Sequence, residues 1–326
     1  MELWNMTGRA GLNGPRKFVI CRAVVGCALL CALVRTTLAS ENVPHLPFAE
    51  WATVPAQGQL VVGLVYEESE AYHVWASGQR QNITWHNSGE SYGIDINQGY
   101  VALQYGITPR WAADLNIGAT TVGWRSFDKG IIQSTTGLMD WSFGVRYQIF
   151  DEAQAPAAWL PTLTFRAGGV LPGSYSQTMA FAPGLRSAAI EPEILLRKHF
   201  GWPGLGVFGD ALFRWNRTTE NDQYITAIGL FQEIKGWELD VGYRHLQTLS
   251  GGDIVLSPDL SIDYPRDVRE ISDAIDAGFS YTTLKRHIRY AFHARTVVDG
   301  NNTDSKFWVG GSVQMPFDLP WAKREP

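Results

Sequence analysis

Residues 139–149 read MDWSFGVRYQI, and hydrophobic and polar side chains alternate along this stretch without a break. The larger apolar set comprises Met139, Trp141, Phe143, Val145, Tyr147 and Ile149, and the alternate set comprises Asp140, Ser142, Gly144, Arg146 and Gln148. A period of two places the sets on opposite faces of a β-strand. Because one face carries large aromatics and the other full charges, we predict that one meets lipid and the other water.

The same alternation returns in residues 111–120, 237–245 and 288–295. A soluble β-sandwich also alternates, but strands of about 12–14 residues are long for a sandwich and normal for a tilted membrane-spanning strand. We therefore predict an all-β fold, a transmembrane antiparallel up-and-down β-barrel of about 12 strands. The predicted strands are 58–67 (extending to Ser77 in a longer alternative), 93–106, 111–124, 137–150, 159–171, 187–200, 205–217, 223–234, 237–248, 269–283, 287–298 and 306–317. Residues 69–92 leave room for an extra strand pair.

The predicted connections alternate in length. Short ones are expected at 107–110, 201–204, 235–236 and 284–286, and the longest at 172–186 and 249–268. Short periplasmic turns and long outer loops are typical of outer-membrane barrels. The tryptophans near these ends predict two aromatic girdles, with Trp111, Trp159, Trp202 and Trp237 on the periplasmic side and Trp124 and Trp215 on the outer side.

The composition favours strands over helices as the membrane-crossing elements. Hydrophobic residues make up 45% of the chain and the mean hydropathy is −0.11, which is low for a helical membrane protein. The 13 Trp, 12 Tyr, 15 Phe and 33 Gly suit a closed barrel with aromatic girdles and tight turns. Beyond the first 39 residues, no segment approaches 18 uninterrupted apolar residues.

The first 39 residues have the pattern of an export signal. Arg9, Arg16 and Lys17 precede the apolar run 18–34, and small residues follow up to Ala39. We predict a signal peptide at 1–39, a periplasmic N-terminal segment at 40–57, a barrel at 58–317 and a polar C-terminal tail at 318–326. The stretch VVGC at 24–27 leaves a lipoprotein form open.

Cysteine and charge exclude several classes of site. Cys21, Cys27 and Cys31 all lie in the predicted signal, so the mature chain has no disulfide or thiolate metal site. Five of 27 basic and one of 32 acidic residues also lie there, which leaves a net charge of −9. Without a basic block, nucleic acid is not an expected partner. The expected partners are outer-membrane lipid, the barrel-assembly machinery and small-molecule solutes, with no cofactor and no metal.

The last predicted strand supports this assignment. Apolar residues stand at every second position up to Phe317, which we predict to be the terminal barrel residue. An aromatic residue that ends the final strand resembles the signal that barrel-assembly machinery recognises. Pro316 and the nine residues after Phe317 depart from that signal.

Four phrases in this sequence resemble the outer-membrane protein family associated with the meta-pathway of phenol degradation. They are QYGITPRW at 104–111, TGLMD at 136–140 with GVRY at 144–147, VLPG at 170–173, and DGNNT at 299–303. The resemblance covers residues 95–317. Met139 stands where the family usually has glycine, and the third phrase lacks the usual threonine. The resemblance implies an outer-membrane channel or transporter for small solutes, with hydrophobic or aromatic ones as the implied class.

The alternation also predicts which polar side chains line the lumen. The predicted lumen residues are Asp114, Asn116, Asp140, Arg146, Arg166, Glu193, Arg197, Asp210, Arg214, Asp240, Arg244, Asp276, Arg289, His293 and Arg295. Mixed charges along a pore would steer and filter polar solutes. The same charges would plug the lumen if they paired across it, which leaves a structural or adhesive barrel as an alternative.

A barrel enzyme of the lipase or lipid A deacylase type is the other alternative. His245 is predicted to point outward near the outer end of its strand, where such enzymes place a histidine beside a serine nucleophile. The serine expected almost directly after it is missing, since Leu246, Gln247 and Thr248 stand there. We therefore predict no catalytic residue and no enzymatic activity.

Overall fold

The computed structural model describes residues 52–76, 78–83, 92–126, 130–175, 184, 187–201, 203–217, 221–253, 255–256, 262–263 and 269–319. Within these residues the regular structure is β-strand, apart from one 3₁₀ turn, η1 (Glu152–Gln154). Among them, no helix has the length and hydropathy to cross a membrane. The predicted signal peptide lies outside the described residues.

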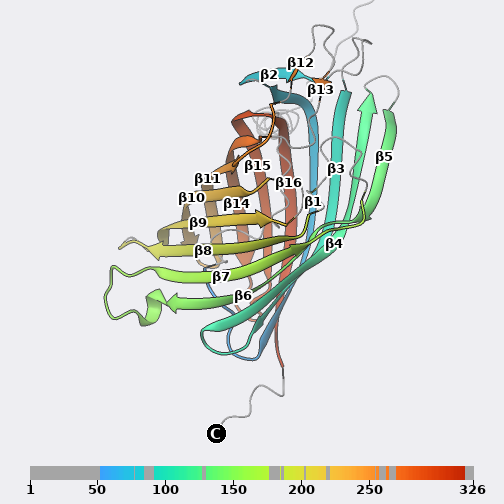
Figure 1. The fold of residues 1–326 in the computed structure, drawn as a ribbon. Helices are drawn as coiled ribbons and strands as arrows, with labels where there is room; N and C mark the ends of the chain where they lie inside the picture. Colours follow the sequence, from blue (N-terminus) through green and yellow to red (C-terminus); the bar gives the residue numbers. More distant parts are fainter. Residues whose placement is uncertain are drawn as a thin grey trace, which may run out of the picture. The chain divides into compact units, whose positions relative to one another are not determined.

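Twelve strands form a closed antiparallel barrel, as predicted (Figure 1). They are β1 (Gln59–Ala76), β3 (Tyr92–Gly106), β4 (Trp111–Ser126), β5 (Gly130–Leu138) continued by β6 (Trp141–Phe150), β7 (Thr162–Leu171), β8 (Ala189–His199), β9 (Leu205–Asn216), β10 (Gln223–Ile234), β11 (Trp237–Thr248), β14 (Ile271–Thr282), β15 (Arg289–Asn301) and β16 (Thr303–Asp318). The remaining described strands are β2 (Gln79–Asn82), β12 (Val255–Leu256) and β13 (Ile262–Asp263).

The first and last strands close the barrel. β1 pairs with β16 from Gln59 opposite Asp318 to Trp75 opposite Thr303. β16 therefore ends one residue beyond Phe317. β1 is a single long strand that reaches Ala76, and β2 pairs with its outer end. In the described residues, the segment 69–92 thus holds the end of β1, the short β2 and the start of β3.

The predicted strand 137–150 is divided in the structure. β4 pairs with β6 along Trp111–Asn116 and with β5 along Ala119–Ser126. The break falls at Met139 and Asp140, where the Asp140 carboxylate accepts hydrogen bonds from the Gly173 N–H at 2.7 Å and the Tyr175 hydroxyl at 3.0 Å. The chain leaves the regular strand there because Asp140 anchors the connection that follows β7.

The turn between β10 and β11 follows from its sequence. Lys235 and Gly236 both have left-handed backbone conformations, with φ of 51° and 88°. Two consecutive positive φ angles give a two-residue turn whose twist matches that of the flanking strands, and glycine adopts one at no steric cost. The predicted short connection at 235–236 is therefore confirmed.

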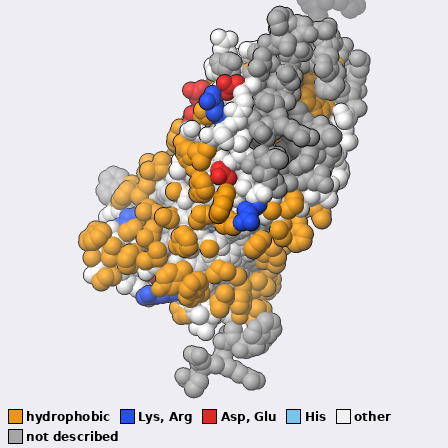
Figure 2. All heavy atoms as spheres, in the orientation of Figure 1, with side chains coloured by type: hydrophobic (Ala, Val, Ile, Leu, Met, Phe, Trp, Pro, Cys, Tyr) orange, Lys and Arg blue, Asp and Glu red, His pale blue; other side chains and the backbone are white. Residues whose placement is uncertain are grey.

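Over most of the wall, hydrophobic side chains face outward and polar ones inward. On β6, Phe143 and Val145 are 44% and 43% exposed, whereas Arg146 between Val145 and Tyr147 is 1% exposed. Figure 2 shows hydrophobic side chains over much of the lower part of the face that it displays. The outward surface is the lipid-facing belt that the alternation predicted.

Trp124 is an exception and corrects the predicted outer girdle. It is 4% exposed and packs inside the wall with Ile94, Ile96, Val122 and other apolar residues. The strand is longer than predicted, and its outer part carries apolar side chains on the inner face. The other tryptophans of the predicted girdles that the structure describes are exposed, namely Trp111, Trp159, Trp215 and Trp237. Trp202 lies outside the described residues.

Candidate functional site

All fifteen predicted lumen residues are buried or half-buried in the structure. The buried ones are Asp114, Asn116, Asp140, Arg146, Arg166, Glu193, Arg197, Arg214, Arg244, Asp276, Arg289 and Arg295, and the half-buried ones are Asp210, Asp240 and His293. Their exposed neighbours along each strand are mostly hydrophobic. The candidate site is therefore the inner face of the barrel, where most of these side chains pair with one another.

One group of ion pairs joins three neighbouring strands. Asp114 on β4 lies 3.1 Å from Nε of Arg146 on β6 and 2.8 Å from Nη2 of Arg166 on β7. Each of these side chains is at most 2% exposed. The shared carboxylate balances part of the arginine charge in a region that water barely reaches, so the loss of one partner would leave a buried charge uncompensated.

The same network continues across β8, β9 and β10. Nη1 of Arg166 lies 3.4 Å from Glu193 and 3.6 Å from Glu191. Glu191 accepts a hydrogen bond from Nε of Arg214 at 2.7 Å, and Nη1 of Arg214 donates to Gln223 at 3.2 Å. Charges of both signs thus cross-link the inner side of the wall from β4 to β9, and the hydrogen bond to Gln223 extends the network to β10.

A second group lies on β9, β11, β14 and β15. Arg244 lies 3.8 Å from Asp210 and 3.6 Å from Asp276, and Arg295 forms a close ion pair with Asp276. The sequence prediction named all four residues, and the structure brings them together. They form a lattice of alternating charges, which holds neighbouring strands in register and lines the lumen with paired groups.

A third group centres on a residue that the sequence reading did not select. Glu67 on β1 lies 3.1 Å from Nε2 of His293 and accepts a hydrogen bond from the Tyr100 hydroxyl at 3.2 Å. Asn116 donates separately to Ser142 at 3.0 Å. Because Glu67 is 2% exposed, His293 and Tyr100 supply hydrogen-bond contacts that water does not.

Gly144 makes room for the first group of ion pairs. A Cβ at this position would stand 2.7 Å from Nε and 3.0 Å from Cζ of Arg166. The guanidinium group therefore packs directly against the backbone of β6. Glycine is required by this close approach and not by any unusual backbone angle.

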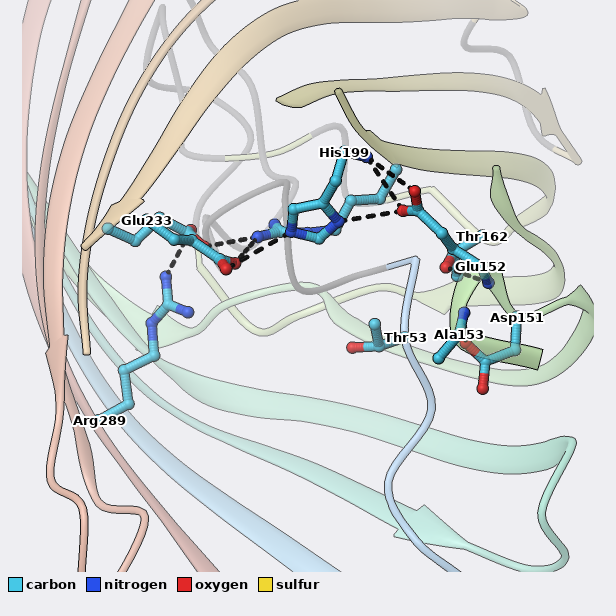
Figure 3. Close-up of a pocket in the computed structure, with 10 residues that line it drawn as sticks. Thr53, Asp151, Glu152, Ala153, Thr162, His199, Glu233 and Arg289 are labelled. Atoms are coloured by element: carbon cyan, nitrogen blue, oxygen red, sulfur yellow. Dashed lines mark hydrogen bonds and ion pairs between the residues drawn. The ribbon is translucent and has the colours of Figure 1, made fainter. Parts of the chain in front are cut away.

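Open space lies at the periplasmic end of the lumen (Figure 3). A pocket of about 520 Å³ is lined by Thr53, Asp151, Glu152, Ala153, Thr162, Arg197, His199, Glu233, Glu238 and Arg289. Arg197 contacts Glu233 closely and donates to Glu238 at 2.7 Å, while Arg289 donates to the other oxygen of Glu238 at 3.1 Å. The Arg197 guanidinium lies 3.7 Å from the centre of the Phe231 ring. This stacking fixes the direction in which Arg197 points.

A clasp holds the η1 turn at the rim of this pocket. Glu152 forms a close ion pair with Lys198 and contacts Nδ1 of His199 at 3.0 Å, and Nε2 of His199 lies 3.4 Å from Glu233 (Figure 3). Partial burial opposes ionisation of Glu152, but the hydrogen bonds from Lys198 and from the backbone and ring of His199 outweigh it. The pKa of Glu152 is therefore held below its ordinary value.

The segment that precedes β1 lies inside the barrel and borders the pocket. The Ala52 carbonyl accepts a hydrogen bond from the Thr164 hydroxyl at 2.7 Å, and Ala52 is 1% exposed. It packs with Val65, Tyr100 and other inward-facing residues. Thr53, the next residue, lines the pocket. The described end of this segment thus narrows the lumen at its periplasmic end.

Several acidic residues of the site were not selected from the sequence, although the signal for two of them, Glu191 and Glu238, was present. Glu191 alternates with Glu193, and Glu238 alternates with Asp240, so the period of two places them on the same inner face. Glu67 ends the predicted strand 58–67, where it stands beside Glu68 and two residues after the inward-facing Val65, so the alternation did not mark its face as polar. Asp304, which forms a fully buried pair with Lys306 on β16, was missed because that strand starts three residues before the predicted position. Lys306 stands at the first position of the predicted strand and was not selected.

The inner face presents paired charges of both signs. Among the described residues, no group of three or more His, Cys, Asp or Glu side chains is placed to hold a metal ion. Most of the inner carboxylates contact arginines, whose charge cannot be removed at any physiological pH. A solute that enters this lumen therefore meets fixed positive and negative groups at close range.

No protein-family model and no curated protein matches this chain. The COG4313 outer membrane channel from Pseudomonas putida F1 superposes with a TM-score of 0.63 at 14% identity, covering 85% of this chain and 100% of that chain. The translocator domain of the autotransporter NalP from Neisseria meningitidis gives 0.45 at 12% identity (92% and 98% covered), and the P. putida toluene transporter TodX gives 0.41 at 9% (82% and 92% covered). The first likeness shows the fold, which is a closed antiparallel β-barrel like that of this outer membrane channel. The link to phenol degradation stays a prediction.

Proposed function

We propose that this barrel is a channel of the bacterial outer membrane that passes small solutes through its charged lumen. The observation that carries the proposal is the closed twelve-stranded wall, whose inner face bears paired charges of both signs above a pocket at the periplasmic end. Fixed charges of both signs favour weak selectivity, since they attract cations and anions in turn. Small aromatic compounds are the solute class that the family resemblance implies, and they form part of the proposal.

The pocket around Arg197 is the proposed selectivity region. Arg197 faces two carboxylates, Glu233 and Glu238, so its loss would leave a net negative charge at the periplasmic mouth. A pore with that charge attracts cations more strongly than anions. Arg197→Gln should therefore shift the reversal potential toward cation selectivity, while Arg217→Gln, at the rim beside Trp215, should leave it unchanged.

The test is single-channel recording in planar bilayers, combined with uptake into protein-containing vesicles of phenol, benzoate and a small sugar. Conductance that responds to Arg197→Gln supports the channel. The absence of both conductance and uptake in the parent protein contradicts it and favours a structural barrel with a packed lumen. Uptake of the sugar alone contradicts the aromatic part of the proposal and leaves the channel intact.

A further inference from the structure

A histidine–aspartate pair lies on the outside of the wall, away from the lumen. His245 on β11 and Asp273 on β14 are direct cross-strand partners, and Nδ1 of His245 lies 2.7 Å from Oδ1 of Asp273. Two positions closer to the periplasm on the same strands, Tyr243 and Ile275 are 44% and 42% exposed and belong to the lipid-facing belt. Because side chains two apart share a face, the pair faces lipid as well.

The pair lies near the outer edge of the apolar belt, three residues from the outer end of β11 and two from that of β14. Leu249, four residues further toward the outer end from His245, is again apolar and 51% exposed, and so is Trp215 on β9. Ionisable side chains on a lipid-facing surface cost free energy and are retained mainly where they have a role. A histidine–aspartate pair between exposed apolar residues therefore calls for a ligand or partner in the membrane.

Three more polar side chains surround the pair. The Tyr243 hydroxyl donates to Asp273, and the Tyr224 hydroxyl donates to Gln247 at 2.5 Å. Tyr224 has a single hydroxyl proton, so its longer contact of 3.3 Å with Nε2 of His245 is the weaker one. Nε2 of His245 consequently keeps hydrogen-bonding capacity for a further partner. We call these five residues, Tyr224, Tyr243, His245, Gln247 and Asp273, the outer-face cluster.

The charge around the cluster indicates what kind of partner fits. Asp299 on β15 is the direct cross-strand partner of Asp273, and two like charges in opposite positions destabilise a sheet. The cluster itself contains no lysine or arginine, the residues that recognise phosphate. It therefore favours a ligand that offers O–H and N–H groups over one that offers a phosphate.

We propose that the outer-face cluster binds the hydroxyl- and amide-bearing sugar head of a glycolipid in the outer leaflet, which is lipopolysaccharide in this membrane. Asp273, Nε2 of His245 and the tyrosine oxygens supply acceptors, while the amide nitrogen of Gln247 supplies donors. The Tyr224 and His245 rings, 5.5 Å apart, offer flat apolar faces to a sugar ring. The cluster lies toward the outer ends of β10, β11 and β14. This site is separate from the lumen and does not depend on the proposed channel.

The proposal is tested by lipid retention. The protein is placed in phosphatidylethanolamine bilayers with and without purified lipopolysaccharide, and the lipids that remain bound are counted by native mass spectrometry. His245→Phe keeps an aromatic ring and removes both ring nitrogens, and Asp273→Asn keeps the shape and removes the charge. Tyr290→Phe, which removes a hydroxyl from a lipid-facing ring elsewhere in the belt, is the matched control. Folding of each variant is confirmed by its resistance to unfolding in detergent.

The wild-type protein and Tyr290→Phe should each retain one lipopolysaccharide molecule. His245→Phe and Asp273→Asn should lower the bound fraction about tenfold, which corresponds to the loss of one or two hydrogen bonds. Retention that both variants leave unchanged would overturn the proposal, as would equal retention of phosphatidylethanolamine alone. Release of fatty acid that His245→Phe abolishes would also overturn it, because the cluster would then be catalytic.

Discussion

Strand β4 passes through two regions in which the same alternation has opposite chemistry. In its periplasmic half, Asp114 and Asn116 are buried inside while Leu115 faces outward. In its outer half, Val122 and Trp124 are buried inside while Arg125 is outside. The pleat fixes which residues share a face, but the surroundings fix which face is apolar. The first region lies in lipid, and the second stands in water with a small apolar core of its own.

Strand lengths agree with this division. β1, β3, β4 and β16 have 18, 15, 16 and 16 residues, whereas β7 to β11 have 10–12, which is close to the length needed to span a bilayer. In Figure 1 the outer ends of β3, β4 and β5 rise well above β7, β8 and β9. On β1 the outward side chains change from Tyr66 to Glu68 and Glu70. This change marks the outer edge of the lipid-facing belt.

The apolar core of the outer region offers the strongest test. Trp124→Ala should lower the free energy of unfolding by about 3–5 kcal/mol, because it opens a cavity among Ile94, Ile96 and Trp308. Trp215→Ala, at an exposed position of the belt, should cost much less, since lipid fills the space. Urea titration of the protein in lipid vesicles measures both values. Equal costs would mean that Trp124 faces lipid and that the two regions do not differ.

At outward-facing positions, a new charge should destabilise the lipid-facing region more than the outer region. Val145→Arg places a charge in the lipid-facing belt and should cost about 2–4 kcal/mol near the midplane. Thr121→Arg, on the outward face of the outer region, should change stability by less than about 0.5 kcal/mol. The same vesicle titration compares the two variants. A large cost for Thr121→Arg would mean that the lipid-facing belt extends past this residue. That would contradict the outer edge inferred from Glu68 and Glu70 on β1.

In the membrane-spanning region, adding a methyl group at an inward-facing glycine should lower stability, but by less than the two changes above. Gly144→Ala should cost about 1–3 kcal/mol, because the new methyl group pushes against the Arg166 guanidinium. Gly99→Ala, on the outward face of β3 with open space around it, should be close to neutral. If Gly144→Ala were equally neutral, Arg166 would have room to move and the ion pairs with Asp114 would not be tightly packed.

Most of the barrel could be predicted from sequence because a period of two is a local signal. Strands β9, β10 and β11 match their predicted ranges to within one residue, and the burial of residues 141–148 follows the predicted faces. The girdle position of Trp124 was wrong because alternation alone does not reveal where lipid ends. The sequence did hold a sign of this change on β4. The outward face carries Leu115 and Ile117 in the periplasmic half of the strand, but the polar residues Thr121 and Arg125 in the outer half.

The pairing of the lumen charges could not be predicted in the same way. Alternation placed Arg166 and Glu193 on the inner face, but which carboxylate meets which arginine depends on the stagger of adjacent strands. That stagger appears only in the register, where Arg166 stands opposite both Arg146 and Glu193. The outer-face cluster shows the same limit. The sequence analysis selected His245 and considered only partners close to it in the chain. Its partner in the structure is Asp273, which lies opposite it on β14.

The smallest predicted effect concerns the periplasmic end, a third environment in which water meets the mouth of the lumen. Because the pKa of Glu152 is lowered in the folded state, its ion pair with Lys198 adds stability above the ordinary value of 4.5, and this contribution is lost as the pH falls through the folded pKa below it. The pair is partly exposed, so the contribution should be about 0.5–1 kcal/mol. Glu152→Gln should therefore be less stable than the parent at about pH 6 and should lose less stability on acidification to about pH 3. Urea titrations of both proteins at the two pH values measure this difference, and the other carboxylates cancel in the comparison. Parallel pH profiles would show that the clasp at the η1 turn does not hold Glu152 ionised, and that this end of the barrel depends on the arginine pairs alone.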